Sequence, residues 1–301
     1  MKKAVLCIAH KGPEQLNIMI RQFLADDGQT DVYLHIDKKA EAIKADIMQH
    51  PNVFFIENSH SITWGNDSTV RMLVDVFNEI VSKNIQYDYF QICTGQDLLV
   101  KPGLNRFLEE SGGKIYIDTY KNDNYVKNLL LHPYPKCLCR DNGNGFMFYA
   151  GIAYALITRV GLIPKKKLRF DWKKVDFWTS YNWSMMPYEV LCYIVKFLNE
   201  KPEFLEMYYG SRVPEDGFLA TLIMNSPYRD RVQFLPDGKK ASSLTFMKPL
   251  HGSHPPILTA EDIEQIDASP CFMARKIDIV KDRKIVEYYE KKVIITEVTQ
   301  S

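Results

Sequence analysis

Apolar residues in the first third of the chain alternate between short unbroken runs and segments with helical spacing. An unbroken run such as AVLCIA is typical of a buried parallel strand, whereas apolar residues three and four apart predict an amphipathic helix. Strands are predicted over 4–9, 31–37, 53–57, 87–95 and 114–118, and helices over 13–24, over 68–83 and just before the glycines of FLEESGG. Ser68 is expected to cap the second helix. This order predicts an α/β fold with a mostly parallel sheet flanked by helices.

Four polar or aromatic residues lie at or just after the ends of the predicted strands. They are His10, Asp37, Trp64 and Asp97. Ligands of open α/β sheets bind outside the carboxyl ends of the strands, so these side chains are candidates for a binding site.

The rest of the chain gives fewer clear signals. Helices are predicted over 188–200 and 217–226, and a turn at RDNGNG (140–145). The basic run at 164–177 is interpreted as a solvated face. The charged tail from about residue 250 is expected to pack over the domain.

The composition is that of an ordinary globular protein, with 46% hydrophobic and 25% charged residues among 301. Lysine plus arginine (38) nearly cancels aspartate plus glutamate (37), which argues against a nucleic-acid partner bound through bulk charge. The six cysteines are scattered without a CxxC pattern and are interpreted as reduced thiols. No stretch approaches the ~18–20 apolar residues of a membrane span or resembles a signal peptide, so a cytoplasmic protein is expected.

Several common site motifs are absent from the sequence, which has no GxxxxGK[ST], GxGxxG, HExxH or GxSxG. HGSH (251–254) holds two histidines, interpreted as solvated loop residues rather than metal ligands. No two aspartates are separated by one residue, so the D-x-D turn with which many sugar-nucleotide enzymes hold a divalent cation is missing. If the protein binds a nucleotide diphosphate, lysine, arginine or helix N-termini must neutralise its charge.

Two adjacent carboxylates, Glu215 and Asp216, lie between a proline and a glycine and precede an apolar run. Acidic residues at a helix N-terminus stabilise it by ~0.3–1 kcal/mol, which is one interpretation of the pair. The other is that one of the two is a catalytic base.

Five segments occur in an order and spacing that point to a known family. They are YLHIDKKAE (33–41), SITWGNDSTV (61–70), YDYFQICTGQDLLVKP (87–102), VPEDGFLATLIMNSPY (213–228) and CFMARKID (271–278). Together they resemble glycosyltransferase family 14, the core-2/I-branching β-1,6-N-acetylglucosaminyltransferases and their xylosyl- and glucuronosyltransferase relatives. The resemblance covers about residues 4–110 and 180–278. It implies one GT-A-type domain (1–301), with a nucleotide-sugar-binding half over about 1–120 and an acceptor-binding and catalytic half over about 121–301.

The resemblance also implies the residues of the nucleotide site. His10 and Asp37 would line the nucleotide pocket, with Asp37 on the uridine, and Trp64 would lie near the base. Gly95 and Asp97 belong to a TGQD turn near the place of the missing D-x-D motif. The alternatives are a core tryptophan for Trp64 and a turn-capping aspartate for Asp97.

The family's base is a glutamate in the pattern P-[DE]-E-x-[FYL]-[FLW]-x-T. Aligned on Pro214 and Thr221, the pattern places Asp216 on the base and Glu215 on the variable acidic position, a reversal of the usual pair. Neighbouring side chains at a helix start point about 100° apart, so only one of them can face the acceptor. Asp216 is favoured over Glu215.

The resemblance implies that the last motif supplies the positive charge for the diphosphate. Lys276 matches the family's lysine, and Arg275 beside it is a natural helper, although an ordinary charged patch is the alternative. A second basic residue of the family has no clear equivalent. Candidate substitutes are Lys248, His251 and His254. In SYNW (180–183), an altered form of the family's acceptor motif, only Trp183 is kept.

The resemblance therefore implies an inverting, metal-independent glycosyltransferase with a UDP-sugar donor, UDP-N-acetylglucosamine in first place, and the missing D-x-D turn agrees with the metal independence. The acceptor would be an oligosaccharide or a lipid-linked glycan in bacterial surface polysaccharide synthesis, with peripheral contact to the inner membrane. The altered motifs motivate a second hypothesis, a catalytically silent module that binds a UDP-sugar or a glycan. A metal-dependent transferase that uses Asp97 alone is disfavoured, because one carboxylate is a poor Mg²⁺ site.

Overall fold

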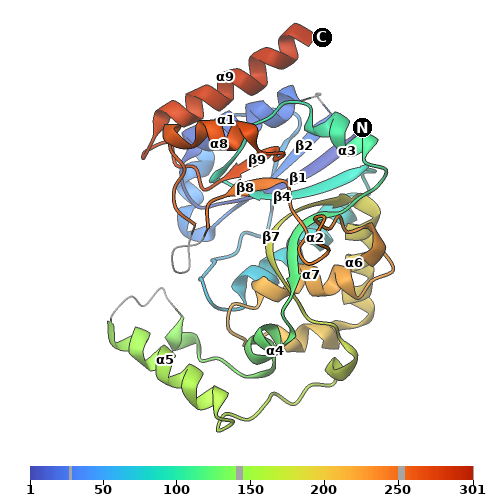
Figure 1. Ribbon diagram of the computed structural model, residues 1–301, viewed down its shortest axis with the longest axis vertical. Coiled ribbons are helices and arrows are strands. Elements are labelled where there is room, and N and C mark those ends of the chain that lie inside the picture. The colour runs from blue at the N-terminus through green and yellow to red at the C-terminus, as the bar shows by residue number, and fades with distance from the viewer. Residues whose placement is uncertain (27–28, 140–144, 250–254, 301) are drawn as a thin grey trace.

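The computed structural model describes residues 1–26, 29–139, 145–249 and 255–300. At its centre is a six-stranded mixed sheet (Figure 1). Its strands are β1 (Lys3–Ala9), β2 (Thr30–Ile36), β3 (Val53–Phe55), β4 (Tyr89–Thr94), β6 (Tyr116–Lys121) and β7 (Trp178–Pro187). They lie in the order β3-β2-β1-β4-β7-β6. The first four are parallel to one another, whereas β7 runs antiparallel to both β4 and β6. The predicted α/β fold with a mostly parallel central sheet is confirmed.

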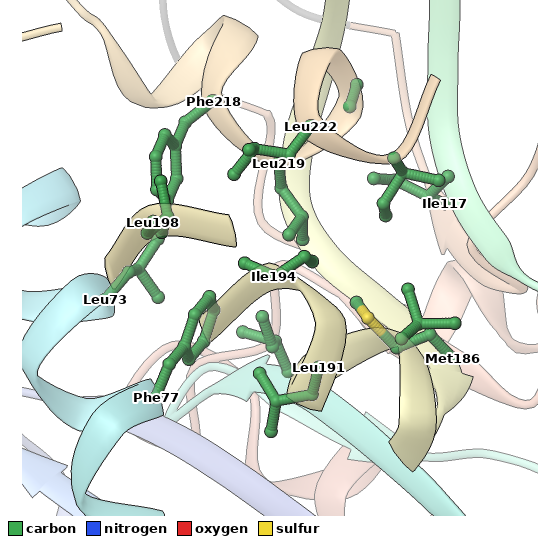
Figure 2. Close-up of a cluster of buried hydrophobic side chains, with 14 of the residues drawn as sticks. Leu73, Phe77, Ile117, Met186, Leu191, Ile194, Leu198, Phe218, Leu219 and Leu222 are labelled. Atoms are coloured by element: carbon green, nitrogen blue, oxygen red, sulfur yellow. The ribbon is translucent and has the colours of Figure 1, made fainter. Parts of the chain in front are cut away.

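Helices cover both faces of this sheet, because successive residues of its central strands point to opposite sides and are apolar on both. In β1, Ala4 and Leu6 belong to one buried core, and Val5 and Cys7 belong to the other. The first core lies under α2 (Ser68–Ser82), α6 (Tyr188–Glu200) and α7 (Glu215–Met224), whose side chains meet in Figure 2. The second lies under α1 (Pro13–Ala25), α3 (Leu104–Glu110), α8 (Ile263–Ala268) and α9 (Arg283–Gln300).

Two further helices, α4 (Asp123–Leu131) and α5 (Gly145–Arg159), lie between β6 and β7 in the sequence. Figure 1 shows α5 at the edge of the molecule, away from the sheet. Short 3-10 helices span Lys38–Asp46, Lys136–Leu138, Trp172–Lys174, Pro202–Met207, Arg229–Arg231 and Ala260–Asp262. Within the described ranges, no helix has the length and apolar character needed to cross a membrane.

A second, three-stranded sheet joins the end of the chain to the middle. Its strands are β5 (Asp97–Leu99), β8 (Thr245–Met247) and β9 (Met273–Arg275). β9 lies in the middle, antiparallel to β5 and parallel to β8. Asp97 is directly opposite Arg275 in this register, so two predicted site residues 178 positions apart become neighbours.

The structure corrects the expected helix cap. The N-cap position of α2 is Asp67, one residue earlier than Ser68. The hydroxyl of Ser68 accepts from the backbone N–H of Thr63 (2.8 Å), while the carboxylate of Asp67 binds Arg71 and the backbone N–H of Gly210. Ser68 is therefore used to fold the preceding loop rather than to cap the helix. The predicted turn at 140–145 falls almost wholly, and the HGSH loop fully, outside the described residues.

Gly217 allows α7 to pack closely on α4. A Cβ atom at this position would lie 2.8 Å from Cγ1 of Val126 and 3.5 Å from the carbonyl oxygen of Trp178. The Gly217→Ala variant is expected to lower the free energy of unfolding by about 1–3 kcal/mol, because overpacking outweighs the gain in helix propensity. Urea unfolding measures the change. Val126→Ala added to Gly217→Ala should recover part of the loss, whereas strictly additive losses would mean that the contact with Val126 is not the cause.

Candidate active site

The carboxyl ends of β1, β2 and β4 meet at one edge of the sheet. The chain passes from β1 to β2 on one side of β1, while β4 lies on the other, so this edge is the topological switch point at which α/β proteins bind ligands. Backbone hydrogen bonds hold the segments after these strands together: Asp37 N–H donates to Ala9 (2.8 Å) and Gly95 N–H to Ile8 (3.0 Å). His10, Asp37, Gly95 and Asp97 all lie at this edge, as the sequence predicts.

Asp37 is buried, and both of its oxygens accept hydrogen bonds from the backbone. One accepts from Lys39 (2.8 Å) and the other from Ile62 (3.1 Å). Through these two hydrogen bonds the carboxylate stabilises the segment that leads to the half-buried Trp64. Its role on a uridine stays a prediction, since the structure gives it a folding role of its own.

A cluster of positive side chains surrounds His10 at the strand ends. Burial of the ring and the charge of Lys11 lower the pKa of His10, and Lys276 and Lys39 add to the effect. Burial, Arg275 and Lys11 likewise lower the pKa of Lys276. Lys11 is paired with Asp278 (2.7 Å), whereas no carboxylate of the described residues forms an ion pair with Lys276. Crowded like charges of this kind create a local positive potential suited to a phosphate.

Asp97 and Arg275 form an ion pair that is almost fully buried, with side chains 1% and 14% exposed. One carboxylate oxygen of Asp97 accepts from the backbone N–H of Thr94 (2.7 Å) and the other from the guanidinium of Arg275 (2.7 Å). Arg275 also donates to the hydroxyl of Thr94. The turn between β4 and β5 needs Gly95, because a Cβ atom there would lie 3.0 Å from Cβ of Ala9.

An aromatic stack continues from Arg275 along β7. The guanidinium carbon lies 3.9 Å from the ring centroid of Trp183, a cation–π distance. Trp183 in turn stacks on Tyr181, with centroids 5.2 Å apart and an interplanar angle of 14°. The two rings share one face of the strand because they are two residues apart. Burial and the neighbouring Tyr120 raise the pKa of Tyr181, and the negative charge of Asp216 adds to the effect.

Glu215 and Asp216 occupy the first turn of α7 in different environments. Glu215 is buried, its Oε2 has no hydrogen-bond partner among the described residues, and burial, with the charge of Asp216, raises its pKa to about 8. Asp216 is half-buried; burial raises its pKa to about 6, against a hydrogen bond from Tyr125 that lowers it. At pH 7 Glu215 is mostly protonated and Asp216 mostly ionised. The N-cap residue of the helix is Pro214, which offers no side-chain hydrogen bond to it.

The structure therefore brings together Trp183, Arg275, Lys276 and Asp97, whereas the partner that it gives Asp216 is Tyr125. Lys248 pairs instead with Asp262 (2.6 Å), and the other two candidate substitutes, His251 and His254, are outside the described residues.

Sequence reasoning missed Tyr125 and Tyr181. The two-residue spacing of Tyr181 and Trp183 in SYNW is a signal that could have identified the stack, whereas nothing in the sequence links Tyr125 to Asp216. In the described parts of the chain, no three His, Cys, Asp or Glu side chains are grouped so as to hold a metal ion.

Comparisons with known proteins give no family. No protein-family model matches the chain, and no curated protein matches it. Solved structures similar to it include mouse xyloside xylosyltransferase 1 (11% identity, TM-score 0.30), over 76% of this chain and 82% of that one. A 4-diphosphocytidyl-2C-methyl-D-erythritol synthase from Anaerococcus prevotii (12% identity) and a putative glucose-1-phosphate thymidylyltransferase from Bacillus anthracis (10%) each match 67% of this chain and 77% of their own, both with TM-scores of 0.30. These similarities are weak, and the fold assignment rests on the strand order and pairing above.

Proposed function

We propose that the protein is an inverting, metal-independent glycosyltransferase that moves N-acetylglucosamine from UDP to a glycan hydroxyl. The observation that carries this proposal is the positive cluster at the switch point, where Arg275 is held between Asp97 and the ring of Trp183, and Tyr181 stacks on that ring. Asp216, whose pKa of about 6 leaves it ionised at neutral pH, supplies the base from the first turn of α7. The choice of UDP-N-acetylglucosamine as the donor rests on the sequence resemblance to glycosyltransferase family 14. Transfer of xylose or glucuronic acid is the alternative within that family.

In the proposed mechanism, each group has one task. Asp216 accepts the proton of the acceptor hydroxyl as its oxygen attacks the anomeric carbon. The bond from that carbon to the phosphate oxygen breaks, and its electron pair leaves with UDP. Lys276 and Arg275 stabilise the negative charge that develops on the diphosphate. Attack opposite to the leaving group inverts the configuration.

Asp97 acts on this site only through Arg275. Its carboxylate is turned inward, toward the backbone of Thr94 and the guanidinium. It is therefore a positioning residue, which holds Arg275 between the turn after β4 and the ring of Trp183. Because both oxygens of Asp97 already accept hydrogen bonds within the protein, the hypothesis that Asp97 binds a metal ion is disfavoured.

Release of UDP from a panel of UDP-sugars, with simple oligosaccharides as acceptors, tests the proposal. UDP-N-acetylglucosamine is expected to turn over fastest, and excess EDTA is expected to leave the rate unchanged, since lysine and arginine replace the cation at the diphosphate. UDP binding without turnover of any UDP-sugar would favour the silent binding module. Activity lost in EDTA and restored by Mn²⁺ would refute the metal-free part alone.

The acceptor is proposed to be a lipid-linked or free glycan of a bacterial surface polysaccharide, reached from the cytoplasm. Transfer assays with lipid-linked and soluble acceptors, compared at equal concentration, test this part independently of the donor.

A further inference from the structure

One face of α5 leaves an unusual set of apolar side chains in solvent. In the segment GFMFYAGIAYALITRVGL the large apolar residues between 41% and 73% exposed are Tyr149, Ile152, Leu156, Ile157, Val160 and Leu162. Positions 149, 152, 156 and 160 follow one another at helical spacing and therefore form a stripe. A contiguous patch of exposed apolar side chains marks an interaction surface, whereas single exposed apolar residues are common on any protein.

The opposite face of α5 already attaches the helix to the molecule. The hydroxyl of Tyr154 donates to the carbonyl oxygen of Pro133, and its ring packs on Tyr134 with centroids 5.5 Å apart. A Cβ atom at Gly151 would lie 3.4 Å from the hydroxyl of Tyr134. The apolar stripe therefore lies on a different face of the helix from the one that packs against the rest of the molecule.

Positive charge lies at the end of this stripe. Residues 145–170 contain no aspartate or glutamate and hold five basic residues, Arg159, Lys165, Lys166, Lys167 and Arg169. Lys166 is internal, with its ammonium donating to the carbonyl oxygens of Glu206 (2.9 Å) and Met207 (2.7 Å), and Arg169 pairs with Glu206. The side chains of Arg159, Lys165 and Lys167 remain exposed, with the ammonium of Lys165 5.0 Å from the ring centroid of Trp172.

The packing face of α5 borders a pocket. This pocket of about 180 Å³ lies between α4 and α5, with Tyr134, Tyr154 and Arg212 in its walls. Burial and the charge of Asp216 raise the pKa of Tyr125 on α4, and the charge of Arg212 partly opposes this.

We propose that α5 and the basic residues that follow it bind the surface of an anionic lipid bilayer, with the apolar stripe in the headgroup boundary. A helix with one apolar face and adjoining lysines and arginines is the usual form of an interfacial membrane anchor. A second copy of the chain fits less well, because a contact between copies through this stripe would leave the basic residues beyond the helix without an anionic partner. The role of this surface, holding the acceptor opening at the membrane, rests on the proposed function; the binding itself does not.

Flotation of the full chain with vesicles tests the proposal. Binding is expected to vesicles of equimolar phosphatidylglycerol and phosphatidylcholine, and to be at least about tenfold weaker to phosphatidylcholine alone. The Ile152→Glu/Leu156→Glu variant is expected to lose at least about tenfold in binding. Val280→Glu, a matched change at a residue 86% exposed outside this surface, is expected to bind like the wild type.

Equal binding by all three proteins, or no binding to anionic vesicles, would overturn the proposal. So would a dimer in gel filtration that the Ile152→Glu/Leu156→Glu variant dissociates, since the stripe would then be a contact between copies. UDP release from UDP-sugars in the absence of vesicles separates this failure from failure of the proposed function. If the protein turns over UDP-sugars but does not bind vesicles, only the proposed membrane-binding surface is refuted. If it binds vesicles but turns over no UDP-sugar, only the proposed enzymatic function is refuted.

Discussion

The Asp216→Asn variant is expected to lower kcat for sugar transfer by about 10²–10⁴-fold, the range that a positioned general base contributes. Asparagine keeps the size of the side chain and can still accept a hydrogen bond from Tyr125, but it cannot take the proton of the acceptor hydroxyl. The affinity for UDP is expected to stay the same, because the substitution leaves the positive charges of Arg275 and Lys276 in place. Initial rates and UDP titration calorimetry measure the two quantities.

The pH profile of the wild type checks the same assignment without a mutation. Only the ionised carboxylate accepts a proton, so activity is expected to fall about tenfold per unit below the pKa of Asp216, about 6, and to level off above it. If Glu215 were the base, the rate would continue to rise up to pH 8, where burial places its pKa.

Glu215→Gln is the matched control, because it removes the neighbouring carboxyl from the same helical turn. Glu215 is mostly protonated at pH 7, and glutamine resembles the protonated acid in size and in having a donor. Activity is therefore expected to remain within about threefold of the wild type, in line with a residue outside the proton transfer. Loss of activity in Glu215→Gln but not in Asp216→Asn would show that the base was assigned to the wrong carboxylate.

The sequence predicted the strand and helix order because that order depends on local patterns. β1 contains the unbroken apolar run AVLCIA, and α6 has apolar residues at helical spacing, so each is recognisable within its own segment. The strands of the second sheet could not be predicted in this way. β5, β8 and β9 have three residues each, too few for a periodic signal, and they form only through pairing with one another, which for Asp97 and Arg275 spans 178 positions.

The residues of the candidate site were likewise predictable where they depend on local pattern and not where they depend on tertiary contacts. His10, Asp37 and Asp97 were identified because each directly follows a strand, and the edge of a parallel sheet gathers such positions. The contact of Asp97 with Arg275 depends on the unpredicted sheet, and the protonation states of Glu215 and Asp216 depend on burial, which no sequence motif records. β7 was missed because its middle, SYNW, is polar and aromatic where it lines the site rather than the core.

Asp97→Ala is expected to lower the free energy of unfolding by about 3–5 kcal/mol, since it leaves the guanidinium of Arg275 without its carboxylate in a nearly buried position. Urea unfolding measures this loss. Glu14→Ala, which breaks the exposed ion pair with Arg283, is the control and is expected to leave the melting temperature unchanged.

A second substitution separates the folding role of the pair from its role in binding. Replacing both partners with apolar residues, as in Asp97→Ala/Arg275→Met, removes the uncompensated charge, and such exchanges are often neutral for stability. The double variant is therefore expected to regain most of the lost stability while UDP affinity stays low, because the positive charge at the diphosphate is gone. UDP affinity that recovers together with stability would mean that Arg275 only holds the fold, and Lys276 would then be the cation that the diphosphate needs.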